Sequence, residues 1–251
     1  MSGHSKWSSI KHKKGAADAK RGKLFSKLSR AIIVAAKEGG GDPVNNLALQ
    51  NAIEKARSYS MPKDNNDRAI AKGSGADSDA DAFETIVYEG YGPEGVAVIV
   101  EALTDNRNRT ASDVRHVFTK HGGNLGATGA VAWQFERRGV VVVPGEGVDE
   151  DELLLAAADA GAEDVERDAD VFQVTSAPES LAAVREAIEA AGFTVDAAEL
   201  TMVPKSTVAV EDETKARQVM RLIDALEDND DVQDVYANFD IPERVLEAVA
   251  G

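Results

Sequence analysis

The chain lacks cysteine altogether. Without thiols it can form no disulfide, no thiolate zinc site and no cysteine nucleophile, and this absence suits a reducing cytoplasm. Aromatic residues make up only 5% of the sequence, and no apolar run approaches the roughly 18 residues that span a bilayer. The first 14 residues are polar and basic, which is not the pattern of a secretory signal. The sequence therefore predicts a cytoplasmic protein with no membrane partner.

Recognisable catalytic motifs are also missing. The sequence contains no Walker loop, nucleophile elbow, zinc-protease helix or dinucleotide fingerprint. Its four histidines do not form a metal set, because His116 and His121 lie on divergent faces, and His4 and His12 lie among lysines that would repel a cation. We therefore expect no enzyme activity, no catalytic residue, no metal, no cofactor and no small-molecule substrate.

What the sequence does have is a strong division of charge. Residues 1–75 contain fifteen Lys and Arg against six Asp and Glu, a net charge of +9. Residues 76–251 contain the other thirteen basic residues against thirty-eight acidic ones, a net charge of −25. A polyanion would therefore be attracted to one end of the chain and repelled by the rest. Charge blocks of this kind are typical of nucleic-acid arms and interaction tails.

The first predicted helix runs from about residue 16 to residue 37. Leu24, Leu28 and Ile32 recur at helical spacing and predict a buried stripe. At about 100° per residue, four cations fall within an arc of about 80° whose centre lies about 120° from that stripe: Lys20, Lys23, Lys27 and Arg30. One helix thus carries a packing face and a cationic face, and a solvated face would normally mix signs. This pattern favours nucleic acid as the partner.

Two further helices complete the predicted basic head. The run 39–41 of three glycines ends the first helix, and Asp42 with Pro43 has the pattern of an N-cap followed by the first helical residue. Met61 and Pro62 separate the second helix from the third, for which Gly73 is a candidate C-cap. Ahead of the bundle, Trp7 is surrounded by lysines. Its indole either stacks on an unpaired base or anchors the basic arm to the bundle.

The acidic remainder alternates strands and helices. We expect strands at 83–89, 96–103, 131–135, 140–143, 164–167, 172–175, 194–203, 207–210 and 232–238, and helices at 109–120, 150–160, 178–191 and 212–226. From residue 139 the order is β-α-β-β-α-β, the ferredoxin-like order. The predicted fold class is α+β, an N-terminal helical bundle followed by two α/β-sandwich (ferredoxin-like) domains. The predicted domains are 1–75, 83–138 plus 205–251, and an inserted 139–204.

The loop 104–110 between a predicted strand and helix is dense in hydrogen-bonding groups. Arg107 and Arg109 are suited to contact RNA or phosphate. The same loop equally suits a structural reading, in which Asn108 or Thr110 caps the following helix. The residues leave these alternatives open.

Several segments together resemble the YebC family. The segments that carry the resemblance are 3–7, 10–14, 18–23, 39–43, 61–65, 88–93, 103–110, 121–125 and 235–241, and they are densest over residues 1–143. The resemblance implies a three-domain bacterial cytoplasmic protein with a helical first domain and two α/β domains. It also implies a role in gene expression linked to nucleic acid. Bacterial members are labelled probable transcriptional regulators that bind DNA, whereas other relatives, including mitochondrial ones, are linked to translation on the ribosome at difficult sequences such as proline runs.

The leading hypothesis is a nucleic-acid-binding regulator of gene expression, named as a DNA-binding transcriptional regulator, whose basic head contacts phosphates. A ribosome- or RNA-binding translation factor is the alternative, and a protein–protein adaptor is a further one. The family has no settled catalytic residue. The candidate nucleic-acid-binding residues are Lys6, Trp7, Lys11, His12, Lys13, Lys14, Lys20, Arg21, Lys23, Lys27, Arg30, Arg107 and Arg109.

Overall fold

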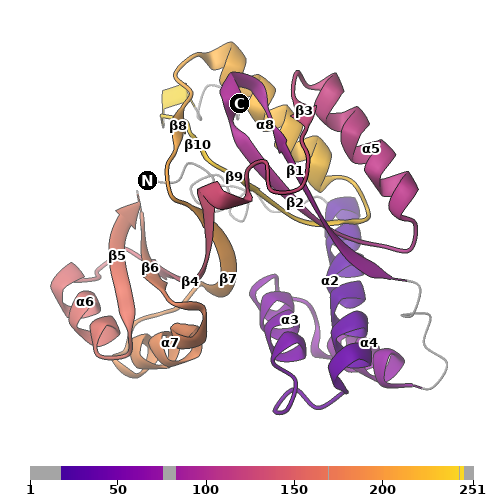
Figure 1. Ribbon diagram of the computed structural model, residues 1–251. Coiled ribbons are helices and arrows are strands. Elements are labelled where there is room, and N and C mark those ends of the chain that lie inside the picture. The colour runs from indigo at the N-terminus through magenta and orange to yellow at the C-terminus, as the bar shows by residue number, and fades with distance from the viewer. Residues whose placement is uncertain (1–17, 76–82, 169, 243, 246–251) are drawn as a thin grey trace. The chain divides into compact units, whose positions relative to one another are not determined.

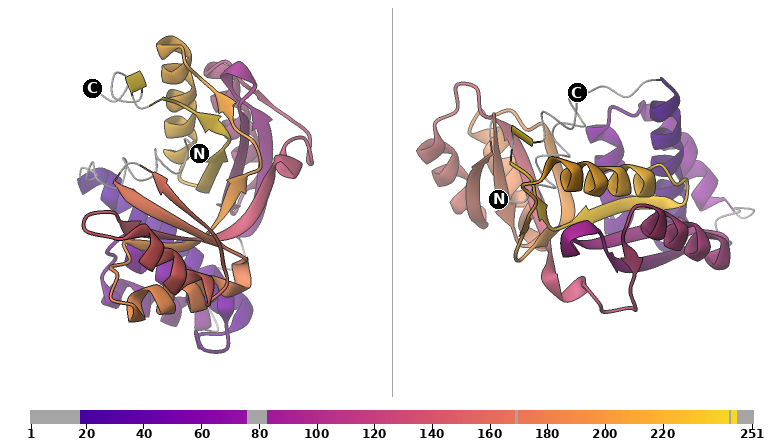
Figure 2. Two further views of the ribbon diagram at one scale, coloured as in Figure 1. Left: turned by 90° about the vertical axis from the view of Figure 1, so that its left-hand side faces the viewer. Right: turned by 90° about the horizontal axis from the view of Figure 1, so that it is seen from above.

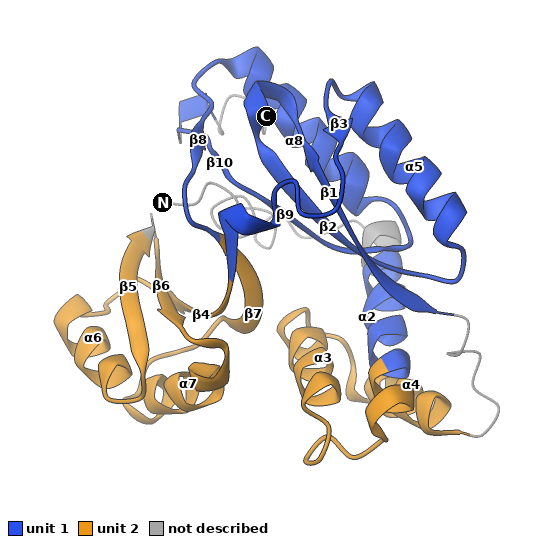
Figure 3. Ribbon diagram, viewed as in Figure 1, with its two compact units in different colours: residues 1–34, 76–136, 204–251 blue, residues 35–75, 137–203 orange. Residues whose placement is uncertain are grey.

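The protein is described here by a computed structural model, which covers residues 18–75, 83–168, 170–242 and 244–245 (Figures 1 and 2). Its fold is α+β, as the sequence predicted, with helices near the N-terminus followed by two four-stranded sheets with their own helices and one two-stranded sheet. The chain divides into two compact units (Figure 3): unit 1 contains 1–34, 76–136 and 204–251, and unit 2 contains 35–75 and 137–203. The three domain boundaries expected from the sequence stay a prediction.

The first described helix is α2 (Asp18–Gly39). Leu28 and Ile32 of the predicted apolar stripe are buried, whereas Leu24 near the start of the helix is half-buried. Gly40 follows with φ +87°, a left-handed conformation that glycine adopts without steric cost. The helix therefore ends in the glycine run, as expected.

The second helix, α3 (Leu47–Ser58), begins later than the sequence suggested. Its N-cap is Asn46, whose side-chain oxygen accepts from the Leu49 amide at 3.1 Å. The amide group of Asn46 also donates to the Ala35 and Gly40 carbonyls at 2.7 and 2.8 Å. The prediction that Asp42 caps this helix was wrong, because the Asp42 carboxylate instead accepts from the Val44 amide and stabilises the preceding turn.

The third helix, α4 (Lys63–Ser74), starts after Pro62, as predicted, with Asp64 in its first turn. Its C-cap is Gly75, and Gly73 is a buried residue inside the helix, so the predicted C-cap at Gly73 was wrong. Gly75 has an extended backbone with φ −77° and ψ 151°, which turns the chain out of the helical path.

The sheet of unit 1 has four strands in the order β3-β1-β2-β9. They are β1 (Glu84–Tyr91), β2 (Ala97–Thr104), β3 (Asn124–Leu125) and β9 (Val232–Ala237). β1 and β9 each pair antiparallel with β2, so a strand from near the C-terminus lies beside one that precedes it by more than a hundred residues. Two further short strands, β8 (Val208–Ala209) and β10 (Phe239–Asp240), pair parallel.

Helices α5 (Arg107–Lys120) and α8 (Glu213–Glu227) contribute to the core against this sheet (Figures 1 and 2). Val98 and Val100, at alternate positions of β2, share one buried cluster with Phe118 of α5 and Leu222 of α8. Burial of each such side chain stabilises the fold by about 1.5–3 kcal/mol. Leu226 and Val232 of this cluster flank the turn between α8 and β9, so the turn lies at the edge of the core.

The second sheet has the strand order β5-β6-β4-β7. Its elements follow along the chain as β4 (Phe135–Pro144), α6 (Glu150–Ala158), β5 (Ala162–Asp168), β6 (Val171–Ser176), η4 (Pro178–Ser180), α7 (Leu181–Ala190) and β7 (Ala197–Pro204). This is the predicted β-α-β-β-α-β order, and Val141, Leu153, Phe172 and Ile188 lie in its core.

The predicted strand at 131–135 was wrong, because η3 (Ala132–Gln134) is a short 3-10 helix and β4 starts at Phe135.

Candidate nucleic-acid interface

Helix α2 carries three of the predicted nucleic-acid contacts whose side chains the structure describes. Lys23, Lys27 and Arg30 are spaced by four and three residues, which places them along one side of the helix. Leu28 and Ile32 are buried and lie on a different side of the helix. The helix thus separates a packing face from a cationic face.

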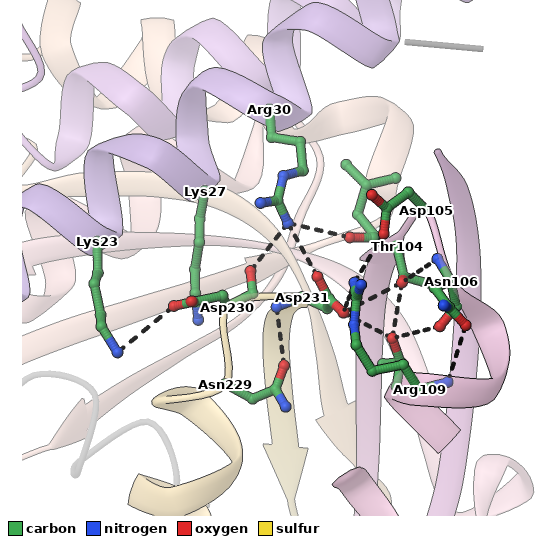
Figure 4. A network of polar contacts seen from close by, with 12 residues as sticks. Lys23, Lys27, Arg30, Thr104, Asp105, Asn106, Arg109, Asn229, Asp230 and Asp231 are labelled. Carbon is green, nitrogen blue, oxygen red and sulfur yellow. Dashed lines mark hydrogen bonds and ion pairs between the residues drawn. The ribbon is translucent and has the colours of Figure 1, made fainter. Parts of the chain in front are cut away.

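All three cations contact one short segment between α8 and β9, residues 227–231, which we call the acidic turn (Figure 4). The Lys23 ammonium lies 3.6 Å from the Asp230 carboxylate. Lys27 donates to the Glu227 carbonyl oxygen at 2.5 Å. Arg30 donates to the Asp230 carbonyl at 3.1 Å and to the Asp231 carboxylate at 3.4 Å. The cationic face is therefore occupied by oxygen atoms of this molecule.

Asp231 is the centre of this network. Besides Arg30, its carboxylate accepts from Arg109 at 2.9 Å, from Thr110 at 2.7 Å and from Thr104 at 3.2 Å. Burial alone would raise the pKa of the Asp231 carboxyl, but hydrogen bonds from Arg109, Thr110 and Thr104 outweigh it and lower that pKa. The hydrogen bonds to Asp231 and Asp105 in turn raise the pKa of Arg109.

The two predicted loop arginines have different surroundings. Arg109 bonds to Asp105 and Asp231, so it holds unit 1 together. Arg107 is 69% exposed in its side chain, with Glu84 at 3.9 Å. The cap of α5 is Asn106, whose side chain accepts from the Arg109 amide. The alternative in which Asn108 or Thr110 supplies that cap was wrong, because Thr110 turns its hydroxyl inward to Asp231.

An apolar contact lies beside the polar one. Val34 of α2 packs with Leu103 of β2, and Ile33 and Phe83 pack around that pair. The Arg30 guanidinium lies 5.0 Å from the centroid of the Phe83 ring, within the range of a cation–π interaction. Arg30 is therefore held by an aromatic ring as well as by oxygen atoms, and its side chain is only 25% exposed.

The remaining predicted contacts are not placed by the structure. Lys6, Trp7, Lys11, His12, Lys13 and Lys14 lie outside the described residues. Lys20 and Arg21 belong to the first turns of α2, and their side chains are not described.

A second buried carboxylate, Glu89 of β1, has a structural role. It is 4% exposed and accepts from the backbone amides of Gly129, Val131 and Ala132 at 2.6–2.8 Å. Burial raises the pKa of Glu89, but the three amide hydrogen bonds outweigh it and lower that pKa. Sequence reasoning singled out neither Glu89 nor the acidic turn. The only signal for the turn was a run of four acids in residues 227–231 directly before a strand.

The part of the chain that the structure describes has neither a metal-ligand cluster nor a membrane-spanning helix. Within it, no three or more His, Asp or Glu side chains are grouped so that they could hold a metal ion. No helix there combines the length and apolarity needed to cross a membrane.

The fold is that of a class of α+β proteins with bacterial members. Residues 5–76 match the family model described as the TACO1/YebC protein N-terminal domain, and residues 83–239 match the TACO1/YebC second and third domain. The chain belongs to the TACO1/YebC family.

Individual relatives are similar over their whole length. A protein of Rubrobacter xylanophilus is 61% identical and one of Syntrophobacter fumaroxidans is 54% identical, each with 100% of both chains covered. Both are named "Probable transcriptional regulatory protein". The crystal structure of a conserved hypothetical protein from Aquifex aeolicus matches with a TM-score of 0.79 and 52% identity, over 90% of this chain and 93% of that one.

Proposed function

We propose that this protein is a non-enzymatic regulator of gene expression that binds nucleic acid through the phosphates, using its basic N-terminal region. The observation that carries the proposal is the cationic face of α2, which is separate from the packing face and faces oxygen acceptors. The names of the relatives support a regulatory role. In its more specific form, the proposal takes transcription, the process that those names print, as the process that is regulated, with DNA as the partner and the cytoplasm as the location.

The chemistry of the face suits phosphates better than bases. Lysine presents a point charge that neutralises a phosphate without reading a base edge, whereas base reading favours the planar groups of Arg, Asn and Gln. Residues 1–75 carry the net charge of +9 that attracts a polyanion, and the net charge of −25 on the rest would keep it from lying elsewhere.

A second candidate is a translation factor that binds ribosomal RNA. The lysine-rich composition of the face favours it, because RNA helices are recognised mainly by shape and by contacts to phosphate and 2′-hydroxyl groups. Both candidates use the same face of α2, so they differ in partner and not in mechanism of contact.

Neutralising the face should weaken nucleic-acid binding and its salt dependence. We expect the triple variant Lys20→Gln, Lys23→Gln and Lys27→Gln to lower the slope of log affinity against log salt by about 2 to 3, since each phosphate contact contributes about 0.9 for duplex DNA. The measurement is fluorescence anisotropy with a labelled duplex DNA and a labelled RNA at several salt concentrations. Gln is preferred to Glu because Glu at 23 or 27 would face the acidic turn.

The matched control removes the same charge from the acidic part. Lys120→Gln, Arg217→Gln and Arg221→Gln change three exposed helical cations of unit 1. An equal loss of binding in both triple variants would contradict the proposal.

Co-sedimentation with ribosomes from a DNase-treated lysate at low and high salt then separates the two candidates: salt-sensitive co-migration favours translation, and its absence at low salt favours DNA.

A further inference from the structure

The acidic turn and a nucleic-acid backbone would use the same partners. Lys23, Lys27 and Arg30 are the described cations of the proposed phosphate-binding face. Each of them contacts a carboxylate or a carbonyl of residues 227–231. Phosphate oxygens are acceptors of the same kind, so a phosphate that binds these three groups competes with the oxygen atoms of the turn.

We propose that the acidic turn is an intramolecular competitor of nucleic acid, which covers the cationic face of α2 until a backbone phosphate displaces it. The inference rests on the proposed function, because the competition needs a nucleic acid that binds this face. It adds a regulatory step that the function alone does not require. Binding then takes place from the fraction of molecules in which the turn has released the face.

Besides the hydrogen bond of Lys27 to the Glu227 carbonyl, the ion pairs between the helix and the turn form two groups. The inner group is Arg30 with Asp231, whose side chains are 25% and 11% exposed. Asp231 is held further by Arg109 and Thr110, and the apolar contact of Val34 with Leu103 lies beside it. This group anchors α2 on the sheet.

The outer group is Lys23 with Asp230, whose side chains are 57% and 72% exposed. Exposed ion pairs contribute little to stability and are screened by salt. Asp230 is therefore the acid of the turn that a phosphate replaces first, before the inner group is released. The difference in exposure identifies Asp230 as the residue that opens first.

The test compares two acids of the same turn. Asp230 contacts α2, whereas the carboxylate of the exposed Asp228 is in contact with none of the α2 side chains that the structure describes. We expect Asp230→Asn to tighten binding of a 20-nucleotide RNA and of a duplex DNA by about two- to fivefold at low salt. This change in affinity corresponds to the usual free-energy contribution of one exposed ion pair. Asp228→Asn, which removes the same charge, should have a smaller effect.

A double-mutant cycle makes the comparison specific. In a Lys23→Gln background the gain from Asp230→Asn should shrink to that of Asp228→Asn, because the pair is already broken. Equal gains from the two asparagine variants, or a gain that persists in full without Lys23, would overturn the inference and leave the proposed function standing. If the wild-type chain and all variants bind neither nucleic acid at low salt, the proposed function itself fails and the inference fails with it.

A distance measurement reads the opening directly. Because the chain has no native cysteine, Ser26→Cys on α2 and Asp228→Cys on the turn can be spin-labelled without other changes, and both positions are exposed. We expect the measured distance between the labels to lengthen when saturating RNA or DNA is added to the full chain. An unchanged distance with nucleic acid bound would overturn the inference.

Discussion

At the scale of single residues, one carboxylate joins three elements of unit 1. Asp231 receives Arg30 from α2, Thr104 from the end of β2, and Arg109 and Thr110 from α5. A buried carboxylate without such donors would be strongly unfavourable, and each donor would lose its acceptor if the carboxylate were removed. The local structure therefore depends on this residue more than on any single surface charge.

We expect Asp231→Asn to lower the free energy of unfolding by about 1–3 kcal/mol at pH 7, because Asn removes the negative charge beside Arg30 and offers one acceptor oxygen where the Asp231 carboxylate offers two. Urea denaturation measures the change, and Asp228→Asn in the same turn should stay within about 0.5 kcal/mol of wild type.

Because the pKa of Asp231 is lowered in the folded state, the stabilisation by its carboxylate is present above the unfolded-state pKa and is lost as pH falls through the folded-state pKa. The difference between wild type and variant should thus shrink at pH 3. A difference that is equal at both pH values would contradict the account.

Glu89 supports a second prediction at this scale. Its carboxylate accepts three backbone amides of the loop before η3, and Gln can offer one oxygen where Glu offers two. We expect Glu89→Gln to lower stability by about 1.5–3 kcal/mol and to speed hydrogen exchange at the amides of Val131 and Ala132. Unchanged exchange at these two amides would show that the loop is held by other contacts.

At the scale of elements, the junction of α2 and α3 shows how one side chain ends one helix and starts another. Asn46 is 6% exposed and satisfies two carbonyls at the end of α2 as well as an amide of α3. Gly39 allows this approach, because a Cβ there would lie 2.5 Å from the Asn46 amide nitrogen. The glycine run thus does more than stop the helix.

We expect Asn46→Ala to lower the free energy of unfolding by about 2 kcal/mol, through the lost cap and the unsatisfied carbonyls. Asp42→Ala, at the position that the sequence favoured as the cap, should cost less than about 1 kcal/mol because Asp42 stabilises only an exposed turn. Thermal or urea unfolding of both variants checks the ranking. The reverse order would show that the cap is less important than the turn.

The sequence alone could not rank these two residues. Asp and Asn are nearly equal as N-caps, and proline after Asp42 strengthened the wrong choice. What decides between them is the place of the α2 carbonyls, which only the folded backbone provides. By contrast, the buried positions of α2 and the succession of strands and helices along residues 135 to 204 follow from periodicity, which is local information.

At the scale of the whole molecule, the charge of the chain is not simply a basic head and an acidic body. Part of the basic charge is matched inside unit 1, where α2 lies against the acidic turn. The attraction for a polyanion is therefore smaller than the net charge of +9 on residues 1–75 implies, and it increases when the turn releases the helix. Salt weakens both the contact of α2 with the acidic turn and the contact of α2 with a polyanion. The affinity for nucleic acid and the release of the turn therefore have to be measured at the same ionic strength.

The sequence by itself determined the α+β class, the helical beginning, the ferredoxin-like strand order and the segregation of charge, because composition and periodicity report burial and local structure directly. Only the tertiary structure decided what the charges contact. Arg30 and Asp231 are 201 positions apart, and no local pattern links them. They meet because β9 pairs with β2 and brings the acidic turn to the strand end on which α2 packs. Long-range strand pairing thus turned a predicted open cationic face into an occupied one.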